Sequence, residues 1–132
     1  MSRGESATPL GKVRGLGSAG HGGSHWLEER FTSVSLVFLS LWLIFSLIML
    51  PALDRQTMTE WLRSAWAAIP MALLVITAFK HGLDGMKVIV DDYVHEEGSR
   101  IGLHFALTMA AIAGAAVSLF ALAKIAFGAP AA

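Results

Sequence analysis

The chain has 132 residues, of which 55% are hydrophobic and 15% charged, and its mean hydropathy of +0.59 is too high for an ordinary soluble domain of this size. The formal net charge is zero, which gives no basis for binding nucleic acid. The absence of cysteine excludes disulfides and cysteine ligands for an iron–sulfur cluster, so any redox centre must use histidine or methionine or be shared with another subunit.

Residues 1–30 form a polar, glycine-rich N-terminal segment without the apolar core of a secretory signal, so a cleaved leader is not expected. Residues 15–20 match the pattern G-x-G-x-x-G, but no apolar strand precedes them and no βαβ unit surrounds them. We therefore predict a flexible surface segment that lies on a partner protein, and not a dinucleotide site.

The rest of the chain predicts an all-α integral membrane protein with three transmembrane helices. The expected spans are residues 31–53, 63–90 and 101–127, each long enough to cross a hydrocarbon core of about 30 Å. Polar loops are expected at residues 54–62 and 91–100. The third span repeats small residues every four positions, which lets helices approach closely in lipid: Ala106, Ala110 and Gly114.

The distribution of basic residues predicts the orientation. Lys and Arg are more frequent in the N-terminal segment and around the second loop than on the opposite side, which favours a cytoplasmic N-terminus in a bacterial inner membrane, or a matrix-facing one if the protein is organellar. Lys80, Asp84 and Lys87 share one face at i,i+4 and i,i+3 spacing, so they can pair with each other. Three helices enclose little, and this charged end of the second span needs cover. Companion subunits are therefore expected, both in the membrane and on its cytoplasmic face.

One face of the second helix carries a candidate ligand set. At about 100° per residue, His81, Gly85, Val88 and Asp92 fall within a narrow sector, with roughly 16 Å along the axis from His81 to Asp92. Haem iron accepts neutral imidazole, and Gly85 leaves room for a porphyrin edge one turn away. A histidine that only hydrogen-bonds a neighbouring helix remains the alternative.

The other histidines are weaker candidates. His104 on the third helix differs from His81 in depth by roughly 10 Å, so it does not suit the opposite side of one upright haem. A second axial ligand is therefore expected from another subunit, and His104 is expected to be a satisfied interfacial histidine. His95 falls in the loop, and His21 and His25 fall in the N-terminal segment.

Asp92 and Tyr93 follow at the predicted cytoplasmic surface. One interpretation is a solvated acid beside an interfacial tyrosine. The other is a quinone site, in which the Tyr93 hydroxyl donates to a ligand carbonyl and Asp92 orients its surroundings or relays protons.

The pattern H-x3-G-x6-D-Y and the three spans resemble the small membrane-anchor subunit, or D subunit, of succinate dehydrogenase, the respiratory complex II. The motif is formed by His81, Gly85, Asp92 and Tyr93. The resemblance covers most of residues 9–100, and further similar segments are residues 10–19, His25-Trp26, residues 30–32 and Val94-His95. Glu29 departs from the glutamine expected before the arginine, and Lys80 and Asp84 are more polar than expected beside a haem ligand.

The resemblance implies a role for each matching residue. His81 is similar to the axial ligand of haem b, with the second histidine supplied by a companion cytochrome b anchor. Arg30 resembles an arginine near the haem propionates, where its fork suits a carboxylate. Tyr93 and Asp92 resemble the ubiquinone-binding pair, and no complete active site is expected in this chain alone.

The resemblance also implies partners and a reaction. A flavoprotein subunit with FAD would oxidise succinate, and an iron–sulfur subunit would pass electrons to ubiquinone at the anchor, which links the tricarboxylic acid cycle to aerobic electron transport. Two alternatives stay open: a fumarate reductase anchor that works in reverse, and a haem-free membrane scaffold subunit.

Overall fold

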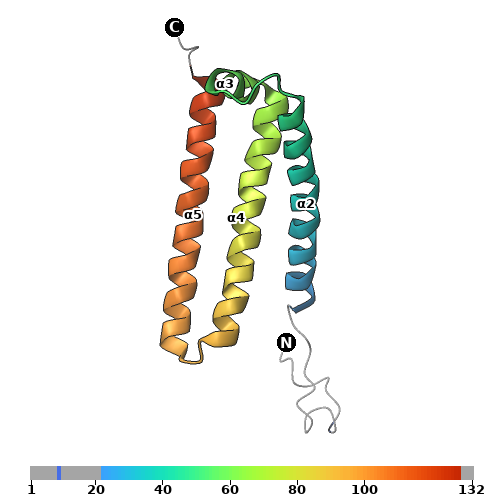
Figure 1. Cartoon of the computed structure of the whole chain (residues 1–132). Helices are drawn as coiled ribbons and strands as arrows, with labels where there is room; N and C mark the ends of the chain where they lie inside the picture. The colour runs from blue at the N-terminus through green and yellow to red at the C-terminus, as the bar shows by residue number, and fades with distance from the viewer. Residues whose placement is uncertain (1–8, 10–21, 129–132) are drawn as a thin grey trace.

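The computed structural model describes Pro9 and residues 22–128. The glycine-rich pattern at residues 15–20, the segment of residues 10–19 and His21 lie outside the described residues, and so does the side chain of His25. The described chain is helical over most of its length, with three long helices and one short one (Figure 1).

Three long helices confirm the all-α class. They are α2 (Gly22–Met49), α4 (Ala65–Tyr93) and α5 (Glu97–Phe127), and each contains a segment apolar and long enough to cross a membrane. The 31 residues of α5 extend roughly 46 Å at about 1.5 Å per residue, more than a hydrocarbon core of about 30 Å. The helices therefore continue past the apolar layer, and the membrane boundaries at residues 31–53, 63–90 and 101–127 stay predictions.

The expected polar loop at residues 54–62 is largely a helix, α3 (Arg55–Arg63), which closes the end of the bundle away from the start of α2 (Figure 1). Asp54 caps α3, because its carboxylate accepts hydrogen bonds from the Thr57 amide and hydroxyl, both at 3.0 Å. Trp61 stacks on Trp42 of α2, with ring centroids 5.8 Å apart and planes at 22°. A cap and one long-range aromatic contact therefore order a segment that composition alone describes as polar.

The second connection is shorter than the predicted loop at residues 91–100, because α4 runs to Tyr93 and α5 begins at Glu97. The Glu96 carboxylate caps α5 by accepting from the Ser99 amide at 2.9 Å, and hydrogen bonds from the Ser99 side chain and backbone lower the pKa of Glu96. The lowered pKa means that this cap is fully formed above the ordinary pKa of glutamate and is lost as the pH falls through the lowered value. Gly98 leaves the space that the carboxylate occupies, since a Cβ there would lie 2.9 Å from Glu96 Oε1.

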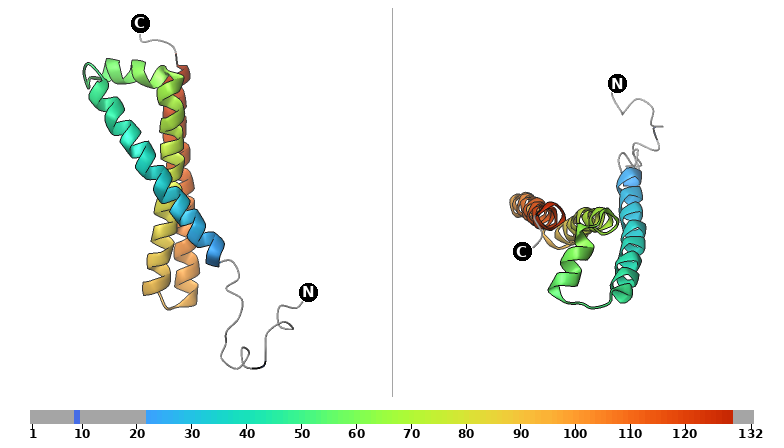
Figure 2. Two further views of the ribbon diagram at one scale, coloured as in Figure 1. Left: turned by 90° about the vertical axis from the view of Figure 1, so that its right-hand side faces the viewer. Right: turned by 90° about the horizontal axis from the view of Figure 1, so that it is seen from above.

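The central helix is α4, with α2 packed on one side and α5 on the other (Figure 2). Within the described part of the chain α2 and α5 do not pack on each other, and only Ala67, Asp84 and Val90 are buried. Most large apolar side chains therefore face outward. In a membrane that surface is available to lipid or to further helices.

A close contact between α4 and α5 occurs at Gly114. The Phe79 ring lies directly against this glycine, and a Cβ at position 114 would stand only 2.5 Å from Phe79 Cε1. The small-residue repeat on α5 predicted such close helix packing, and the structure identifies the aromatic side chain that needs the space.

We expect Gly114→Ala to destabilise the α4–α5 pair by about 1–3 kcal/mol, because the Phe79 ring must shift away from the added methyl group. The measurement is the thermal unfolding midpoint of the complex purified in mild detergent. Gly102→Ala is the matched control on α5, because a Cβ there meets nothing within 4 Å. A midpoint for Gly114→Ala equal to that of Gly102→Ala would contradict the proposed steric cause.

Candidate functional site

His81 lies half-buried in the middle of α4, where it faces α2. Its Nδ1 atom is 3.0 Å from Oγ1 of Thr32, a residue of α2 that is 49 positions away in sequence. The ring therefore makes the interhelical hydrogen bond that the alternative reading of His81 required. That contact occupies one ring nitrogen, and an imidazole has a second nitrogen that can bind a metal.

A groove of about 430 Å³ lies between α2 and α4 beside this histidine, and residues of both helices line it. Its lining contains three of the predicted site residues, His81, Gly85 and Arg30, and the complete set is Glu29, Arg30, Ser33, Val34, His81, Gly85 and Val88. Gly85 opens the groove one turn from the imidazole, because a Cβ built there would meet nothing within 4 Å. The helical spacing predicted that His81, Gly85 and Val88 share a face, and the structure adds the facing wall from α2.

Arg30 brings a permanent positive charge to the groove. Its guanidinium carbon lies 5.1 Å from the centre of the Trp26 ring, close enough for a cation–π contact that restrains the side chain. Arg30 is exposed in the isolated chain, and a guanidinium carries a planar fork of donors that matches a carboxylate.

The charged end of α4 is paired across the same two helices. Lys80 Nζ lies 2.5 Å from Asp84 Oδ2 and 3.3 Å from Glu28 Oε2 of α2. Asp84 is only 7% exposed, so its carboxylate depends on Lys80 to offset the loss of hydration. Sequence spacing predicted the Lys80–Asp84 pair, whereas Glu28 was not predicted as a partner.

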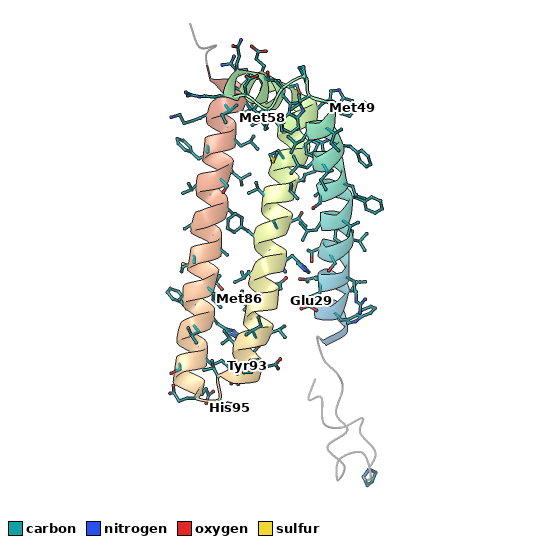
Figure 3. All side chains as sticks on the ribbon, in the orientation of Figure 1. Glu29, Met49, Met58, Met86, Tyr93 and His95 are labelled. Carbon is teal, nitrogen blue, oxygen red and sulfur yellow. The ribbon has the colours of Figure 1, made fainter. Side chains whose placement is uncertain are left out.

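Tyr93 and Asp92 are separate from the groove. Both lie in the last turn of α4, at the end of the bundle where the 94–96 connection lies (Figure 3). Tyr93 is 79% exposed, and it is roughly 18 Å along α4 from His81. The two predicted sites therefore occupy different depths, and any ligand held at Tyr93 needs walls beyond those that residues 22–128 supply.

His104 belongs to a different cluster. Its Nε2 atom lies 3.1 Å from Asp91 Oδ1, although the angles do not satisfy a hydrogen bond, and Arg100 Nε lies 3.9 Å from the same oxygen. His104 is on α5, which does not pack on α2, and it does not line the groove. Since Asp91 is ten residues beyond His81 on α4, His104 lies roughly 15 Å from the level of His81 along the helix axis.

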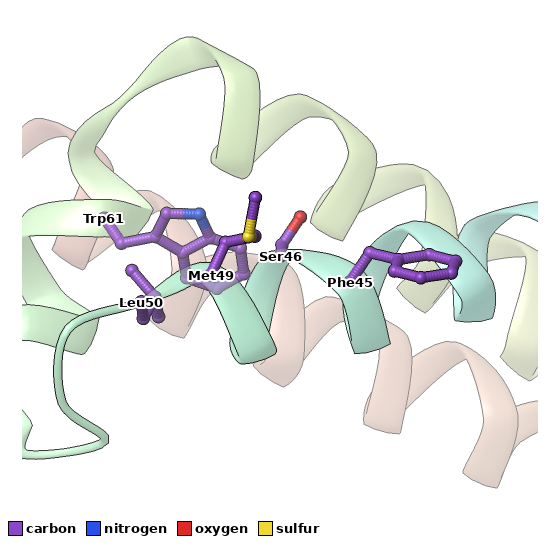
Figure 4. A pocket seen from close by; sticks show the side chains of 5 residues that line it. All are labelled: Phe45, Ser46, Met49, Leu50 and Trp61. Atoms are coloured by element: carbon purple, nitrogen blue, oxygen red, sulfur yellow. The ribbon is translucent and has the colours of Figure 1, made fainter.

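A second hollow lies near the opposite end of α2, beside α3 (Figure 4). Five residues line it: Phe45, Ser46, Met49, Leu50 and Trp61. None of these side chains is an ordinary haem ligand apart from the methionine, and none is charged, so the groove at His81 is the stronger candidate site.

The fold and the groove together define a class of protein: a multi-pass helical membrane subunit with an interhelical groove that carries one histidine and one arginine. Residues 5–120 match the family described as succinate dehydrogenase/fumarate reductase transmembrane subunit, and the chain belongs to this family.

Individual relatives agree with the family match. The succinate dehydrogenase hydrophobic membrane anchor subunit of Rickettsia bellii is 35% identical over 83 residues, which is 63% of this chain and 66% of that protein. The subunits of the same name from Rickettsia conorii and Paracoccus denitrificans are 30% and 27% identical. The match to the Rickettsia conorii subunit covers 63% of this chain and 67% of that protein. The match to the Paracoccus denitrificans subunit covers 92% of this chain and 94% of that protein.

Sequence reasoning missed two residues that the structure brings to the site, Thr32 and Glu28, both on α2. Thr32 had a weak signal, since it follows Arg30 in the segment that resembles the family. Nothing in the spacing of α4 indicates which residues of α2 face it, because that depends on how the two helices cross.

Proposed function

We propose that the chain is the small anchor subunit of a succinate:ubiquinone oxidoreductase, in which His81 is one axial ligand of haem b and Tyr93 and Asp92 contribute to the ubiquinone site. The observation that carries the proposal is the groove in which His81, Gly85 and Arg30 meet. It is supported by membership of the family and by relatives whose names describe succinate dehydrogenase anchor subunits.

The residues of the groove fit a haem. The His81 ring is held through Nδ1, so Nε2 is the nitrogen left for iron. Gly85 provides open space where any other side chain would project, and Val88 provides an apolar surface beside it. Arg30 offers a fork of donors for a propionate. Haem would supply a reversible one-electron centre within the anchor.

The proposed haem also needs a companion anchor subunit. His104 lies at another depth and does not line the groove, so the proposal takes the second axial histidine from a companion subunit. The outward-facing apolar surfaces of α2 and α5 are suitable for a companion helix bundle.

At the proposed quinone site the Tyr93 hydroxyl donates a hydrogen bond to a ubiquinone carbonyl oxygen. Asp92 keeps a carboxylate next to that donor, where it can orient the surroundings and accept or pass on a proton. The exposure of Tyr93 agrees with a site whose remaining walls come from an iron–sulfur subunit.

The proposed complex contains two further subunits, which dock on one side of the membrane. A flavoprotein subunit with FAD and an iron–sulfur subunit would dock at the end of the bundle that carries Tyr93, where the start of α2 also lies (Figure 1). Positive residues favour the cytoplasmic side for this end, in a bacterial inner membrane, or the matrix side in a mitochondrion.

Purification of the complex with its native partners tests this proposal. We expect a b-type band in the reduced-minus-oxidised spectrum and faster succinate oxidation with ubiquinone than fumarate reduction with a low-potential quinone. Faster fumarate reduction with matched quinones would favour the fumarate reductase anchor. Absence of the band from a fully assembled complex would favour the haem-free scaffold.

A further inference from the structure

The side chain of Thr32 joins α2 to the imidazole of His81 on α4. Its hydroxyl makes two short contacts, at 3.0 Å to His81 Nδ1 and at 3.0 Å to the backbone carbonyl oxygen of Glu29. The second contact is within α2 and is a donated hydrogen bond, because a carbonyl oxygen has no proton to give.

These two contacts determine where the protons lie. A threonine hydroxyl has one proton and two lone pairs, so a hydroxyl that donates to Glu29 can only accept from the His81 ring. The proton between the two side chains must then belong to Nδ1. In a neutral imidazole with its proton on Nδ1, Nε2 is the nitrogen with a free lone pair.

Binding of iron at Nε2 leads to the same arrangement. An imidazole that gives its Nε2 lone pair to a metal and stays neutral must carry its proton on Nδ1, and an N–H group away from water requires an acceptor. Thr32 Oγ1 is the acceptor at hydrogen-bond distance in the described structure. The protein thus prepares the ring for a metal by a residue that contacts His81 but does not itself line the groove.

We propose that Thr32 is the positioning residue for the haem ligand: it fixes the orientation and tautomer of His81 and makes the imidazole a stronger electron donor to iron. This inference rests on the proposed function, since it requires His81 to be an axial ligand. An accepted hydrogen bond from Nδ1–H increases electron density on the ring, which stabilises ferric over ferrous iron and lowers the reduction potential.

The test replaces Thr32 with valine, which keeps the branched shape and removes the hydroxyl. In the assembled complex we expect haem affinity to fall 10–100-fold, the range typical of lost outer-shell partners. We also expect the ferric-to-ferrous equilibrium to shift about tenfold toward ferrous iron, which raises the one-electron midpoint potential by about 59 mV. Thr32→Ser keeps the hydroxyl and should restore both values.

Thr108→Val is the matched control. Its hydroxyl also donates to a backbone carbonyl one turn earlier, that of His104 at 2.7 Å, but it lies on α5 away from the groove. A potential in Thr32→Val that equals those of wild type and Thr108→Val, with full haem content, would overturn the inference. Failure of Thr32→Ser to restore a changed potential would also overturn it, because the effect would then not depend on the hydroxyl.

A measurement on the wild-type complex covers the case in which Thr32→Val does not assemble. With histidine labelled by ¹⁵N and the haem reduced, the His81 signal is assigned by its absence from His81→Ala. An Nδ1–H proton with the downfield shift of a hydrogen-bonded group supports the inference, and an unprotonated Nδ1, or an Nδ1–H without that shift, overturns it.

Haem content separates this inference from the proposed function. No haem in the assembled wild type, or full haem in His81→Ala, overturns both the role of His81 and the role of Thr32. Haem that depends on His81 but has a potential independent of Thr32 overturns only the inference about Thr32.

Discussion

Replacing His81 with alanine is expected to remove the b-type absorption band from the assembled complex. The reason is that an axial imidazole holds the iron directly, and the methyl group of alanine offers no lone pair in its place. The measurement is the reduced-minus-oxidised visible spectrum, normalised to the flavin content of the complex so that loss of haem is not confused with loss of protein. We expect less than about a tenth of the wild-type band, which corresponds to loss of roughly 1.4 kcal/mol or more of haem affinity when haem is limiting.

His104→Ala provides the matched control for this experiment. It removes an imidazole of the same size from α5, beside Asp91 and away from the groove, so the band should survive. A band that survives in His81→Ala and disappears in His104→Ala would transfer the ligand to α5 and contradict the assignment made here.

The second large effect is expected for Tyr93→Phe, which should lower succinate-dependent ubiquinone reduction by about tenfold or more while the haem band remains. A hydrogen bond worth about 1.4 kcal/mol to a bound carbonyl corresponds to a factor of ten, and phenylalanine keeps the ring but not the donor. Tyr93 is the only tyrosine of the chain, so a tyrosine-selective label in this subunit reports on this position alone. Protection of that label by ubiquinone would support the same site.

Two controls make the Tyr93 result specific. Succinate-dependent reduction of an artificial dye, which takes electrons before the anchor, should be unchanged in Tyr93→Phe. Trp66→Phe alters an aromatic side chain that is 87% exposed near the other end of α4, and it should leave ubiquinone reduction unchanged. Equal loss of dye reduction in Tyr93→Phe would point to faulty assembly and contradict a role at the quinone.

The three long helices could be predicted from the sequence because hydropathy is a local property. A run of about 20 apolar residues must satisfy its backbone internally in lipid, and a helix does so without reference to the rest of the chain. The connections were less predictable. The helix α3 and the short 94–96 turn depend on the caps Asp54 and Glu96 and on the Trp42–Trp61 stack, which are specific contacts and not averages over a window.

The candidate site could likewise be predicted only in part from the sequence. Residues of one helix could be placed together from their spacing, so His81 with Gly85, and Lys80 with Asp84, were both expected on shared faces. The partners from α2 could not be placed, because the rotation and crossing of α2 on α4 decide which side chains meet. Only that packing brings Arg30 of α2 to the groove. It also brings Thr32 to the imidazole of His81, and Glu28 to the Lys80 ammonium group.

By itself, then, the sequence determined a membrane protein of three spans, a histidine followed one turn later by a space-giving glycine, and an acid–tyrosine pair just after the same span. Only the tertiary structure decided that α4 is central, that α2 supplies the second wall of the groove, and that Thr32 holds the Nδ1 side of His81. The physical reason is range: helical periodicity and hydropathy act within a few turns, whereas a hydrogen bond between residues 49 positions apart exists only after two helices have packed.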